Sequence, residues 1–206
     1  MSGRAFGPCL VWPRMGALRK QGYMGLSLEF GDRLMLIGGD MVAAESGEWM
    51  DSVNPATEAV HGRVPAASVA DVDRAVQAAA QAQKEWAARS VFARGQLLRD
   101  LASAIKSRAG DVLPMESADT GNTIASLDND IRLAAGYIEM MAGLGIELKG
   151  ETVPATAENI HFTIRQPFGV VGRIVPFNHP FLFAAAHLAA PLMAGNAVVL
   201  KSPDQS

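Results

Sequence analysis

Apolar runs and the breaks between them organise residues 166–206 more clearly than any other part of the chain. A β-branched run at 170–175 predicts a buried strand, which stops at Pro176. Residues 181–194 are apolar nearly all round, which predicts a buried helix, and the glycine-asparagine pair after it is typical of a helix end. A second run at 197–200 predicts another buried strand, so the pattern indicates a strand–helix–strand unit.

Polar residues follow both strands of this unit. Pro180 suits the first turn of the helix, and Asn178 or His179 ahead of it is a candidate N-cap. In a right-handed βαβ unit the carboxyl ends of both strands open onto one edge of the sheet, where doubly wound folds bind ligands. We therefore predict that Asn178 and Lys201 face one crevice. An acid just past the second strand, here Asp204, commonly holds a ribose hydroxyl pair, although no phosphate-binding G-x-G-x-x-G precedes it.

Two other stretches show extended patterns. Residues 34–42 and 49–53 flank a glycine-containing loop and predict one surface β-hairpin, which ends in a turn at Asn54-Pro55. Further along, residues 150–166 end in alternating apolar and polar residues and predict an extended hairpin whose edge is unpaired.

Helical periodicity fills the region between these stretches. The first predicted helix starts at a capping-box pair, Ser68 and Asp71, and runs to about Arg89. Ser90 is expected to cap a second helix, which stops at Gly110. The apolar stripes of both helices are interpreted as packing surfaces.

Two further helices are predicted, a shorter one at 111–120 and a longer one at 127–148. The inward face of the longer helix is expected to carry Ile131, Ala134, Ala135, Ile138 and Met141. Four acids on these helices show neither metal-like spacing nor an accompanying histidine, and we interpret them as solvated: Glu116, Asp119, Asp128 and Asp130. No metal site is predicted.

Composition limits the classes of function. With 206 residues and 49% hydrophobic content, the chain has material for a core in one or two domains. The net charge of −3 and the lack of a basic face argue against a nucleic-acid partner. The single cysteine, Cys9, cannot form an internal disulfide, which favours a reducing, cytoplasmic location. The most membrane-like stretch, 181–200, is interrupted by proline and glycine, so no membrane span is predicted.

The N-terminal stretch has a different composition. Residues 1–30 are rich in glycine and carry four basic residues before the first acid, Glu29, a balance that resembles an organellar targeting peptide. Glycines and prolines interrupt any amphipathic helix there, and an extension upstream of a later true start fits equally well. We predict that residues 1–33 are a disordered or wrongly assigned extension.

The motifs of the C-terminal unit carry a family resemblance. PFNHP, followed after the predicted helix by GNAVVLKSPDQS, resembles the aldehyde dehydrogenase superfamily, whose members show a proline-aromatic-asparagine-x-proline turn and a G-N-x-V-V-x-K-x-x-[ED] strand end. Upstream, LMLIGGDMV, SVNPATEAV, VPAASVADVDRAVQAA and QPFGVVGRIVPFN are similar in the same order, so the resemblance covers about 34–206. It implies an α/β fold in which helices pack on an incomplete parallel Rossmann-like sheet, with an extended hairpin arm.

The resemblance also implies roles for individual residues. Asn178 matches the asparagine whose amide helps form the oxyanion hole, and Lys201 and Asp204 match the pair that holds the adenosine ribose hydroxyls. Pro176 and Phe177 would line the cofactor channel. The implied cofactor is NAD or NADP, with NAD slightly favoured, although an aspartate is shorter than the glutamate more usual at position 204.

Each of these residues also has a simpler interpretation. Asn178 alone would more often be an N-cap, and Lys201 and Asp204 would usually be solvated charges. His179 stands where the family more often has an aromatic or aliphatic side chain, and packing or capping is the simplest role for it. His187 on the predicted helix is interpreted as a neutral core histidine.

The family's reaction needs residues that this sequence does not match. It uses a cysteine nucleophile and a glutamate base, whereas Cys9 lies in an unmatched stretch. We therefore expect a fragment of a longer enzyme that is inactive alone. Its expected parts are an N-terminal extension at 1–33, the hairpin and helical part of the cofactor domain at 34–149, an oligomerisation hairpin at 150–166, and the first βαβ unit of the nucleotide-binding sheet at 167–206.

For the complete enzyme, the resemblance implies an NAD(P)-dependent oxidation of an aldehyde to a carboxylic acid through a cysteine thiohemiacetal, in a homo-oligomer. A CoA-acylating member would use CoA in place of water. The alternative from another class is a non-catalytic truncated homologue that acts as a binding or assembly module.

Overall fold

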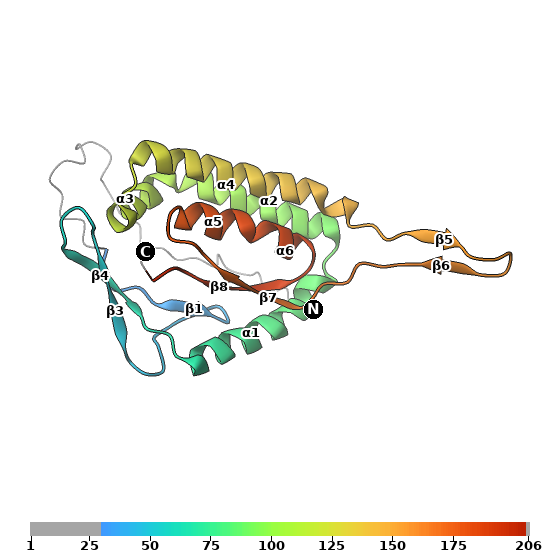
Figure 1. Ribbon diagram of the computed structural model, residues 1–206, viewed down its shortest axis with the longest axis horizontal. Helices are drawn as coiled ribbons and strands as arrows, with labels where there is room; N and C mark the ends of the chain where they lie inside the picture. The colour runs from blue at the N-terminus through green and yellow to red at the C-terminus, as the bar shows by residue number, and fades with distance from the viewer. Residues whose placement is uncertain (1–29, 205–206) are drawn as a thin grey trace, which may run out of the picture.

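Helices surround a small parallel sheet in the computed structural model, which describes residues 30–204 (Figure 1). The strands are β1 Met35–Ile37, β2 Asp40–Val42, β3 Trp49–Val53, β4 Val60–Pro65, β5 Thr152–Pro154, β6 Ile160–Phe162, β7 Val170–Ile174 and β8 Ala197–Lys201. The helices are α1 Val69–Ala88, α2 Val91–Ser107, α3 Ala109–Thr120, α4 Ile124–Leu144, α5 Pro180–His187 and α6 Ala189–Met193, with a 3₁₀ turn, η1, at Gly145–Glu147. The α/β class predicted from the sequence is confirmed.

The first four strands form two hairpins, so the prediction of a single hairpin is wrong. β1 pairs with β2 through Gly38 and Gly39, and β3 pairs with β4 through a turn that starts at Asn54. The two glycines have φ of 65° and 97°, the positive values that a two-residue hairpin turn of this kind needs at both central positions. This glycine pair was the signal that the pattern-based prediction passed over.

The first two helices begin as predicted. Ser68 and Asp71 form a reciprocal capping box on α1, and the Ser90 side chain accepts a hydrogen bond from Ala93 N at the start of α2. The predicted stop of the second helix at Gly110 is wrong, because α2 ends at Ser107 and Gly110 lies in the first turn of α3. There the glycine adopts a helical conformation.

The next two helices also differ slightly from prediction at their ends. Gly121, with φ of 75°, closes α3 as expected. Thr123 was not recognised as a cap, and its side chain accepts a hydrogen bond from Ser126 N, so α4 begins three residues before the predicted Leu127. α4 ends at Leu144, and the chain continues as the 3₁₀ turn η1.

The core lies where α2, α4 and α6 meet. Leu98 and Ile138 are its largest fully buried side chains. A second cluster of small residues, Ala134, Ala185 and Ala186, lies where α4 packs against α5. The predicted inward residues of α4 are buried, except that Met141 is half-buried and packs against the edge of the core.

β7 and β8 pair in parallel and are joined by helices, which confirms the predicted strand–helix–strand unit. They lie between α5 and α6 on one side and α1 on the other (Figure 1). The crossover is two short helices that meet at Leu188, where a single helix was expected. Both strands are half-buried, in contrast to the predicted full burial, because no further strand covers their outer edges in residues 30–204.

Three side chains from α1 and α2 hold the C-terminal end of α6, which leads into β8. Gln83 Nε2 donates to Gly195 O at 3.0 Å, Trp86 Nε1 to Leu192 O at 2.8 Å, and Arg94 Nε to Met193 O at 3.1 Å. These donors satisfy carbonyl groups that a helix end leaves without partners. The start of β8 is therefore fixed to the helical body.

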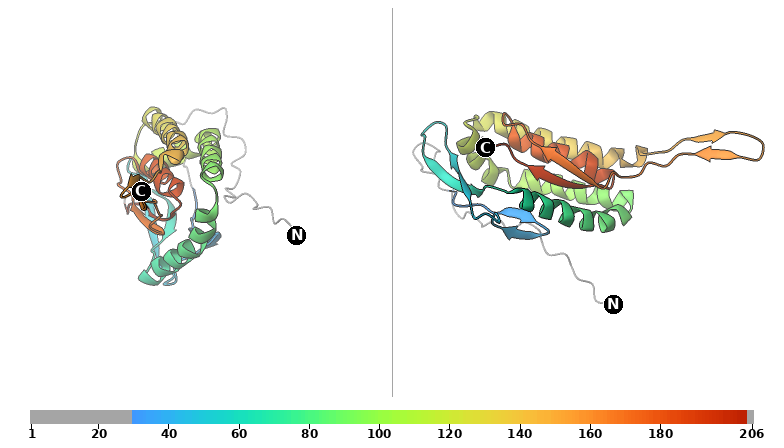
Figure 2. Two further views of the ribbon diagram at one scale, coloured as in Figure 1. Left: turned by 90° about the vertical axis from the view of Figure 1, so that its right-hand side faces the viewer. Right: turned by 60° about the horizontal axis from the view of Figure 1, so that its bottom comes forward.

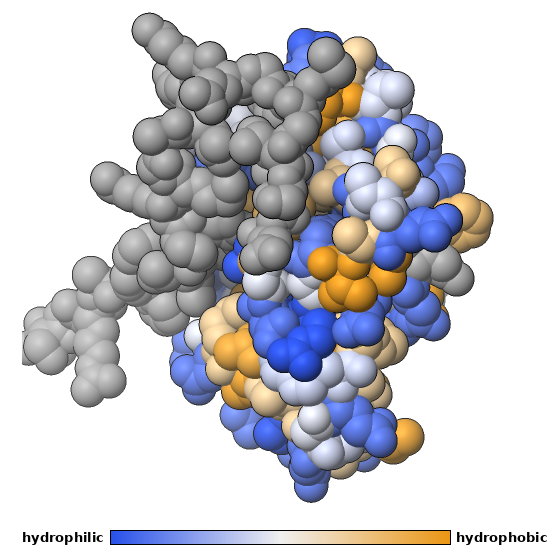
Figure 3. Space-filling view, turned by 90° about the vertical axis from the view of Figure 1, so that its left-hand side faces the viewer, coloured by the Kyte–Doolittle hydropathy of each residue, from blue (hydrophilic) through white to orange (hydrophobic). Residues whose placement is uncertain are grey.

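β5 and β6 form the predicted extended hairpin, which projects from one end of the molecule (Figures 1 and 2). Every residue of both strands is exposed, including Val153, Ile160 and Phe162. On the opposite end, apolar side chains form separate small patches among charged ones on the visible face (Figure 3). The apolar side chains of the β5–β6 hairpin are thus exposed on both of its strands.

Among residues 30–204, no helix combines the length and apolar character needed to cross a membrane. The predictions made for residues 1–29, including the assignment of Cys9, lie outside the described part of the chain.

Candidate functional site

The carboxyl ends of β7 and β8 lie side by side, as the sequence predicted. Ile174 is paired with Lys201, and Val175 N donates to Lys201 O at 3.0 Å. Residues that follow the two strands therefore leave the sheet from neighbouring points of one edge. We call residues 176–181 the Asn178 turn and residues 201–204 the Lys201 segment.

The Asn178 turn is exposed on its outer side and buried at its base. Pro176, Phe177 and Asn178 are exposed, whereas Pro180 is buried at the first position of α5. His179 occupies the N-cap position without a capping hydrogen bond from its side chain. Asn178 is therefore not the N-cap, which removes the simpler interpretation of this residue.

The backbone carbonyl of Asn178 is engaged, whereas its side chain is not. Asn122 Nδ2 donates to Asn178 O at 3.0 Å. In the described part of the chain, the side-chain amide of Asn178 makes no hydrogen bond. Its two N–H groups are therefore available to a ligand.

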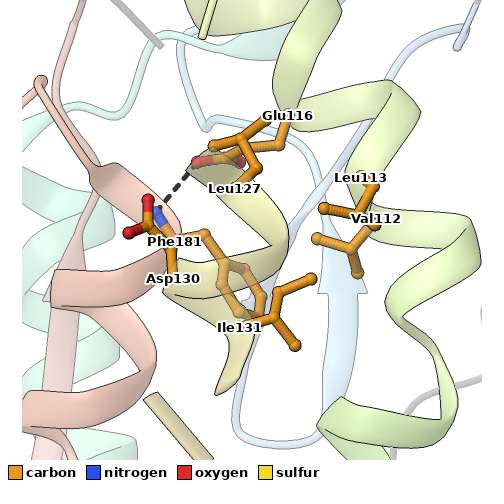
Figure 4. Close-up of a pocket in the computed structure, with 7 residues that line it drawn as sticks. All are labelled: Val112, Leu113, Glu116, Leu127, Asp130, Ile131 and Phe181. Atoms are coloured by element: carbon orange, nitrogen blue, oxygen red, sulfur yellow. Dashed lines mark hydrogen bonds between the residues drawn. The ribbon is translucent and has the colours of Figure 1, made fainter. Parts of the chain in front are cut away.

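Two carboxylates, on α3 and α4, form hydrogen bonds with the same turn. Asp130 Oδ2 lies 2.7 Å from His179 Nδ1, and Phe181 N donates to Glu116 Oε1 at 3.0 Å (Figure 4). The Glu116 carboxylate thereby satisfies one backbone N–H that the first turn of α5 leaves without an intrahelical acceptor. We call Glu116, Asn122 and Asp130 the supporting residues.

Burial of Glu116 raises the pKa of its carboxyl group above the ordinary value. The hydrogen bond from Phe181 N opposes this change, whereas the nearby carboxylates of Asp119 and Asp130 add to it. The surrounding side chains are mostly apolar: Val112, Leu113, Leu127, Ile131 and Phe181 line a narrow gap beside the two acids (Figure 4). This surrounding explains why the pKa of Glu116 is raised, since an apolar environment disfavours the charged carboxylate.

The interpretation of the four helix acids as solvated is wrong for three of them. Asp130 is buried, Glu116 is half-buried, and Asp119 accepts a hydrogen bond from Ser52. Only Asp128 is as expected, because its side chain is 40% exposed and pairs with Arg132 at 2.7 Å. Asp130 lies on the buried face of α4 beside Leu127, Ile131 and Ala134, and an acid in such a stripe was the signal that could have revealed it.

The Lys201 segment is open to solvent. The Nζ atom of Lys201 donates to Asp204 Oδ1 and to Ser202 O, the latter at 2.9 Å. The side chains of Lys201 and Asp204 are 56% and 68% exposed. The segment thus presents a cationic donor and an anionic acceptor side by side.

A second polar network, absent from the sequence-based predictions, joins the β3–β4 hairpin to α3. Ser52 Oγ lies 2.8 Å from His61 Nε2 and donates to Asp119 Oδ1, while the His61 ring is buried. In a hydrolytic triad the acid and the nucleophile bind opposite ring nitrogens, whereas here both approach Nε2, since Asp119 Oδ1 lies 3.4 Å from the same atom. The arrangement therefore joins two elements and does not activate the serine.

His187 is half-buried, in contrast to the core position that was expected, and its surroundings favour the neutral ring. Burial lowers the pKa of its imidazole, and the neighbouring Arg173 charge lowers it further. A guanidinium N–H of Arg173 points at His187 Nδ1, which must then be the acceptor nitrogen of a neutral ring.

Within residues 30–204, no group of histidine, cysteine, aspartate and glutamate side chains is arranged to hold a metal ion.

Comparison with known proteins finds a matching family and related sequences. The sequence model of the Aldehyde dehydrogenase family matches residues 41–206. The chain is 38% identical over 159 residues to aldehyde dehydrogenase tropH of Talaromyces stipitatus, a match that covers 76% of this chain and 31% of that protein.

Solved structures show the same similarity. The aldehyde dehydrogenase of Bacillus cereus in its NAD⁺ complex superposes with a TM-score of 0.81 at 31% identity, over 85% of this chain and 36% of that one. PnpE from Pseudomonas sp. WBC-3 superposes with a TM-score of 0.80 at 33% identity, over 83% and 35%. The chain spans about a third of the length of each of these relatives.

Proposed function

The chain belongs to the aldehyde dehydrogenase family, and from this premise we propose that it supplies part of a nicotinamide-dinucleotide site and one oxyanion-hole donor to the oxidation of an aldehyde. The observation that carries the proposal is the pairing of Ile174 with Lys201. It brings the Asn178 turn and the Lys201 segment to one edge of a parallel sheet, where such sheets bind ligands.

The Lys201 segment has the chemistry to hold a ribose. Each hydroxyl of a vicinal diol both donates and accepts hydrogen bonds, and Lys201 with Asp204 offers an exposed donor beside an exposed acceptor. Bound NAD would supply the hydride acceptor of the reaction, and the Bacillus cereus relative was solved with NAD⁺. We propose NAD over NADP by a small margin, because the Asp204 carboxylate would repel a 2′-phosphate although its reach is short.

Pro176 and Phe177 would line the channel beside the cofactor. Both are exposed at the edge that β7 and β8 share, and 61% of Phe177 is accessible to solvent. An exposed aromatic ring at such an edge offers an apolar surface to a ligand.

Asn178 would act on the aldehyde oxygen. When a thiolate adds to the carbonyl carbon, negative charge develops on the oxygen, and a fixed amide N–H donor stabilises it by a few kcal/mol. The Asn178 side-chain amide is exposed and makes no hydrogen bond within residues 30–204, so it can take this role without breaking an existing contact.

The nucleophile of the family reaction is not among the residues that match. Cys9 is the only cysteine, and it lies outside the matched residues 41–206. We propose that these 206 residues alone do not oxidise aldehydes, and that in the complete enzyme the thioester is released to water, or to CoA in an acylating member. We further propose that the β5–β6 hairpin serves assembly into a homo-oligomer in a reducing, cytoplasmic compartment.

Titration of NAD⁺ against the purified chain tests the cofactor site. Lys201→Ala should weaken binding by about tenfold or more, because it removes a charge-assisted hydrogen bond worth about 1.5–3 kcal/mol. Lys149→Ala is the matched control, because Lys149 is equally an exposed lysine in an ion pair, at the base of the hairpin. Its affinity should stay within about twofold of the parent.

Two outcomes would favour the non-catalytic assembly module instead. One is no binding of NAD⁺ at any practical concentration. The other is equal weakening by both lysine variants. The exposed apolar residues of the β5–β6 hairpin favour this alternative, because exposed apolar side chains are typical of a protein-binding surface.

A further inference from the structure

We propose that Glu116, Asn122 and Asp130 are positioning residues for Asn178. They hold the backbone of the Asn178 turn in one conformation while leaving the Asn178 amide free. The inference deepens the function proposed above and rests on it for the role of Asn178, although the positioning itself can be measured independently.

The three supporting residues engage three different parts of one short turn. Asn122 binds the carbonyl of Asn178 at 3.0 Å, and Asp130 binds the ring of His179 at 2.7 Å. Glu116 binds the backbone N–H of Phe181, also at 3.0 Å. The contacts come from α3, from the α3–α4 connection and from α4, so the turn cannot shift relative to any one of them without losing a hydrogen bond.

Both ends of the turn are fixed as well. At its start, Val175 N is bonded to Lys201 O of the neighbouring strand. At its end, Pro180 is buried and has its φ restricted by its ring. The contact from Asn122 then fixes the middle of the turn, at the residue whose side chain would act on the substrate.

Asn122 is itself firmly placed. It follows Gly121, the left-handed residue that ends α3, and its backbone N–H donates to Thr120 Oγ1 at 3.2 Å. Its carbonyl accepts a hydrogen bond from Ser117 Oγ at 2.7 Å. Because hydrogen bonds to α3 side chains fix both the N–H and the carbonyl group of Asn122, its side chain holds the Asn178 turn at a fixed position relative to α3.

Asp130 adds a contact that is costly to lose. Its side chain is only 7% exposed, and without His179 a buried carboxylate would lack this partner. The aromatic ring of Phe183 lies edge-on to the His179 ring, with 6.4 Å between the centroids, which further restricts the imidazole. A donor that stabilises a transition state has to be in place before charge develops. By restricting the His179 ring, Asp130 and Phe183 help to keep the neighbouring Asn178 in place.

The chain offers a close control for the central contact. Gln83 Nε2 donates to Gly195 O at 3.0 Å, which is the same kind of bond, from a side-chain amide to a backbone carbonyl, as that from Asn122 to Asn178. It lies before β8 at the opposite end of the strand. Asn122→Ala and Gln83→Ala should therefore lower the urea midpoint by similar amounts, while only the first should affect Asn178.

The test is nuclear magnetic resonance relaxation on the ¹⁵N-labelled chain. Asn122→Ala should lower the order parameters of the Asn178 backbone N–H and side-chain NH₂ clearly below those of the parent. Gln83→Ala should leave them unchanged. Equal order at Asn178 in the parent and in Asn122→Ala would overturn the proposal, as would an equal loss in both variants.

A second pair of variants covers the buried contact. Asp130→Asn keeps an oxygen that can accept from His179, so it should retain most of the order at Asn178, whereas Asp130→Ala should lose it. If Asp130→Ala does not fold, the order at Asn178 in Asn122→Ala still decides the matter, and full retention of order in that variant would refute positioning. A parent chain with an ordered Asn178 turn that fails to bind NAD⁺ would count against the proposed function alone.

Discussion

The Asn178 turn and the Lys201 segment leave the same edge of one sheet, yet they are built in opposite ways. The first is held by three side chains from two other helices and their connection. Within residues 30–204, the side chains of the second make only local hydrogen bonds, between Lys201, Ser202 and Asp204, and both of its charged side chains are more than half exposed.

The difference matches what each region would have to do. A donor that stabilises developing charge loses its effect when it is misplaced by even a fraction of an ångström, so its support must exist before the substrate binds. A pair that holds two ribose hydroxyls can adopt its final geometry on the ligand, at some cost in ordering. We infer that the contacts from other helices are placed at the Asn178 turn because the position of its donor must be fixed before the substrate binds.

The largest effect should come from removing the buried support. Asp130→Ala leaves His179 without its acceptor and should lower the free energy of unfolding by about 2 kcal/mol. Asp204→Ala, which removes an exposed acid, should change the same quantity by less than about 0.5 kcal/mol. Urea denaturation of both variants measures the contrast, and equal effects would show that the two regions do not differ as described.

An intermediate effect is expected at the residue that leads into Asn122. Gly121 has φ of 75°, and a Cβ there would lie 3.0 Å from Pro55 Cγ. Gly121→Ala should therefore cost about 1–2 kcal/mol of stability through backbone strain. Gly136→Ala, on the open face of α4, is the control and should be neutral or slightly stabilising. If Gly121→Ala were as stable as its control, the left-handed cap would not be a constraint on the turn.

The smallest effect is a dependence on pH. Because the folded state raises the pKa of Glu116 above its ordinary value near 4.5, Glu116 contributes stability below that value, and the contribution is lost as pH rises through the folded pKa. Glu116→Gln keeps an oxygen for Phe181 N but does not titrate. The unfolding free energy of the parent minus that of Glu116→Gln should fall as the pH rises from 4 through the folded pKa of Glu116. A difference that stayed constant or grew over this range would contradict the assigned cause.

Local patterns were enough to predict much of the fold. The capping box at Ser68, the glycine at position 121 and the two β-branched runs each act within a few residues, and each was found where expected. The two hairpins were merged in the prediction because alternation alone does not show which strands pair, and only the turn residues Gly38 and Gly39 decide it.

The candidate site could be predicted only in part. A strand–helix–strand pattern predicts that the strand ends before Asn178 and at Lys201 lie together, and the parallel register confirms that these ends are adjacent. That the two side chains face one crevice stays a prediction. The supporting residues could not be predicted, because Glu116 and Asp130 lie 65 and 49 residues from their partners in the chain. No periodicity specifies which acid of a helix faces which neighbour. The positioning role of the supporting residues, like the ribose-binding role of Asp204, stays a prediction.

The central claim is that the Asn178 turn and the Lys201 segment form two parts of one dinucleotide site. Its most direct test is an NAD⁺ titration of the ¹⁵N-labelled chain followed by two-dimensional resonance spectra. The account predicts that signals of residues 175–178 and 201–204 shift together with one dissociation constant, while those of the β5–β6 hairpin stay in place. Shifts confined to one of the two regions, or found only elsewhere in the chain, would contradict it.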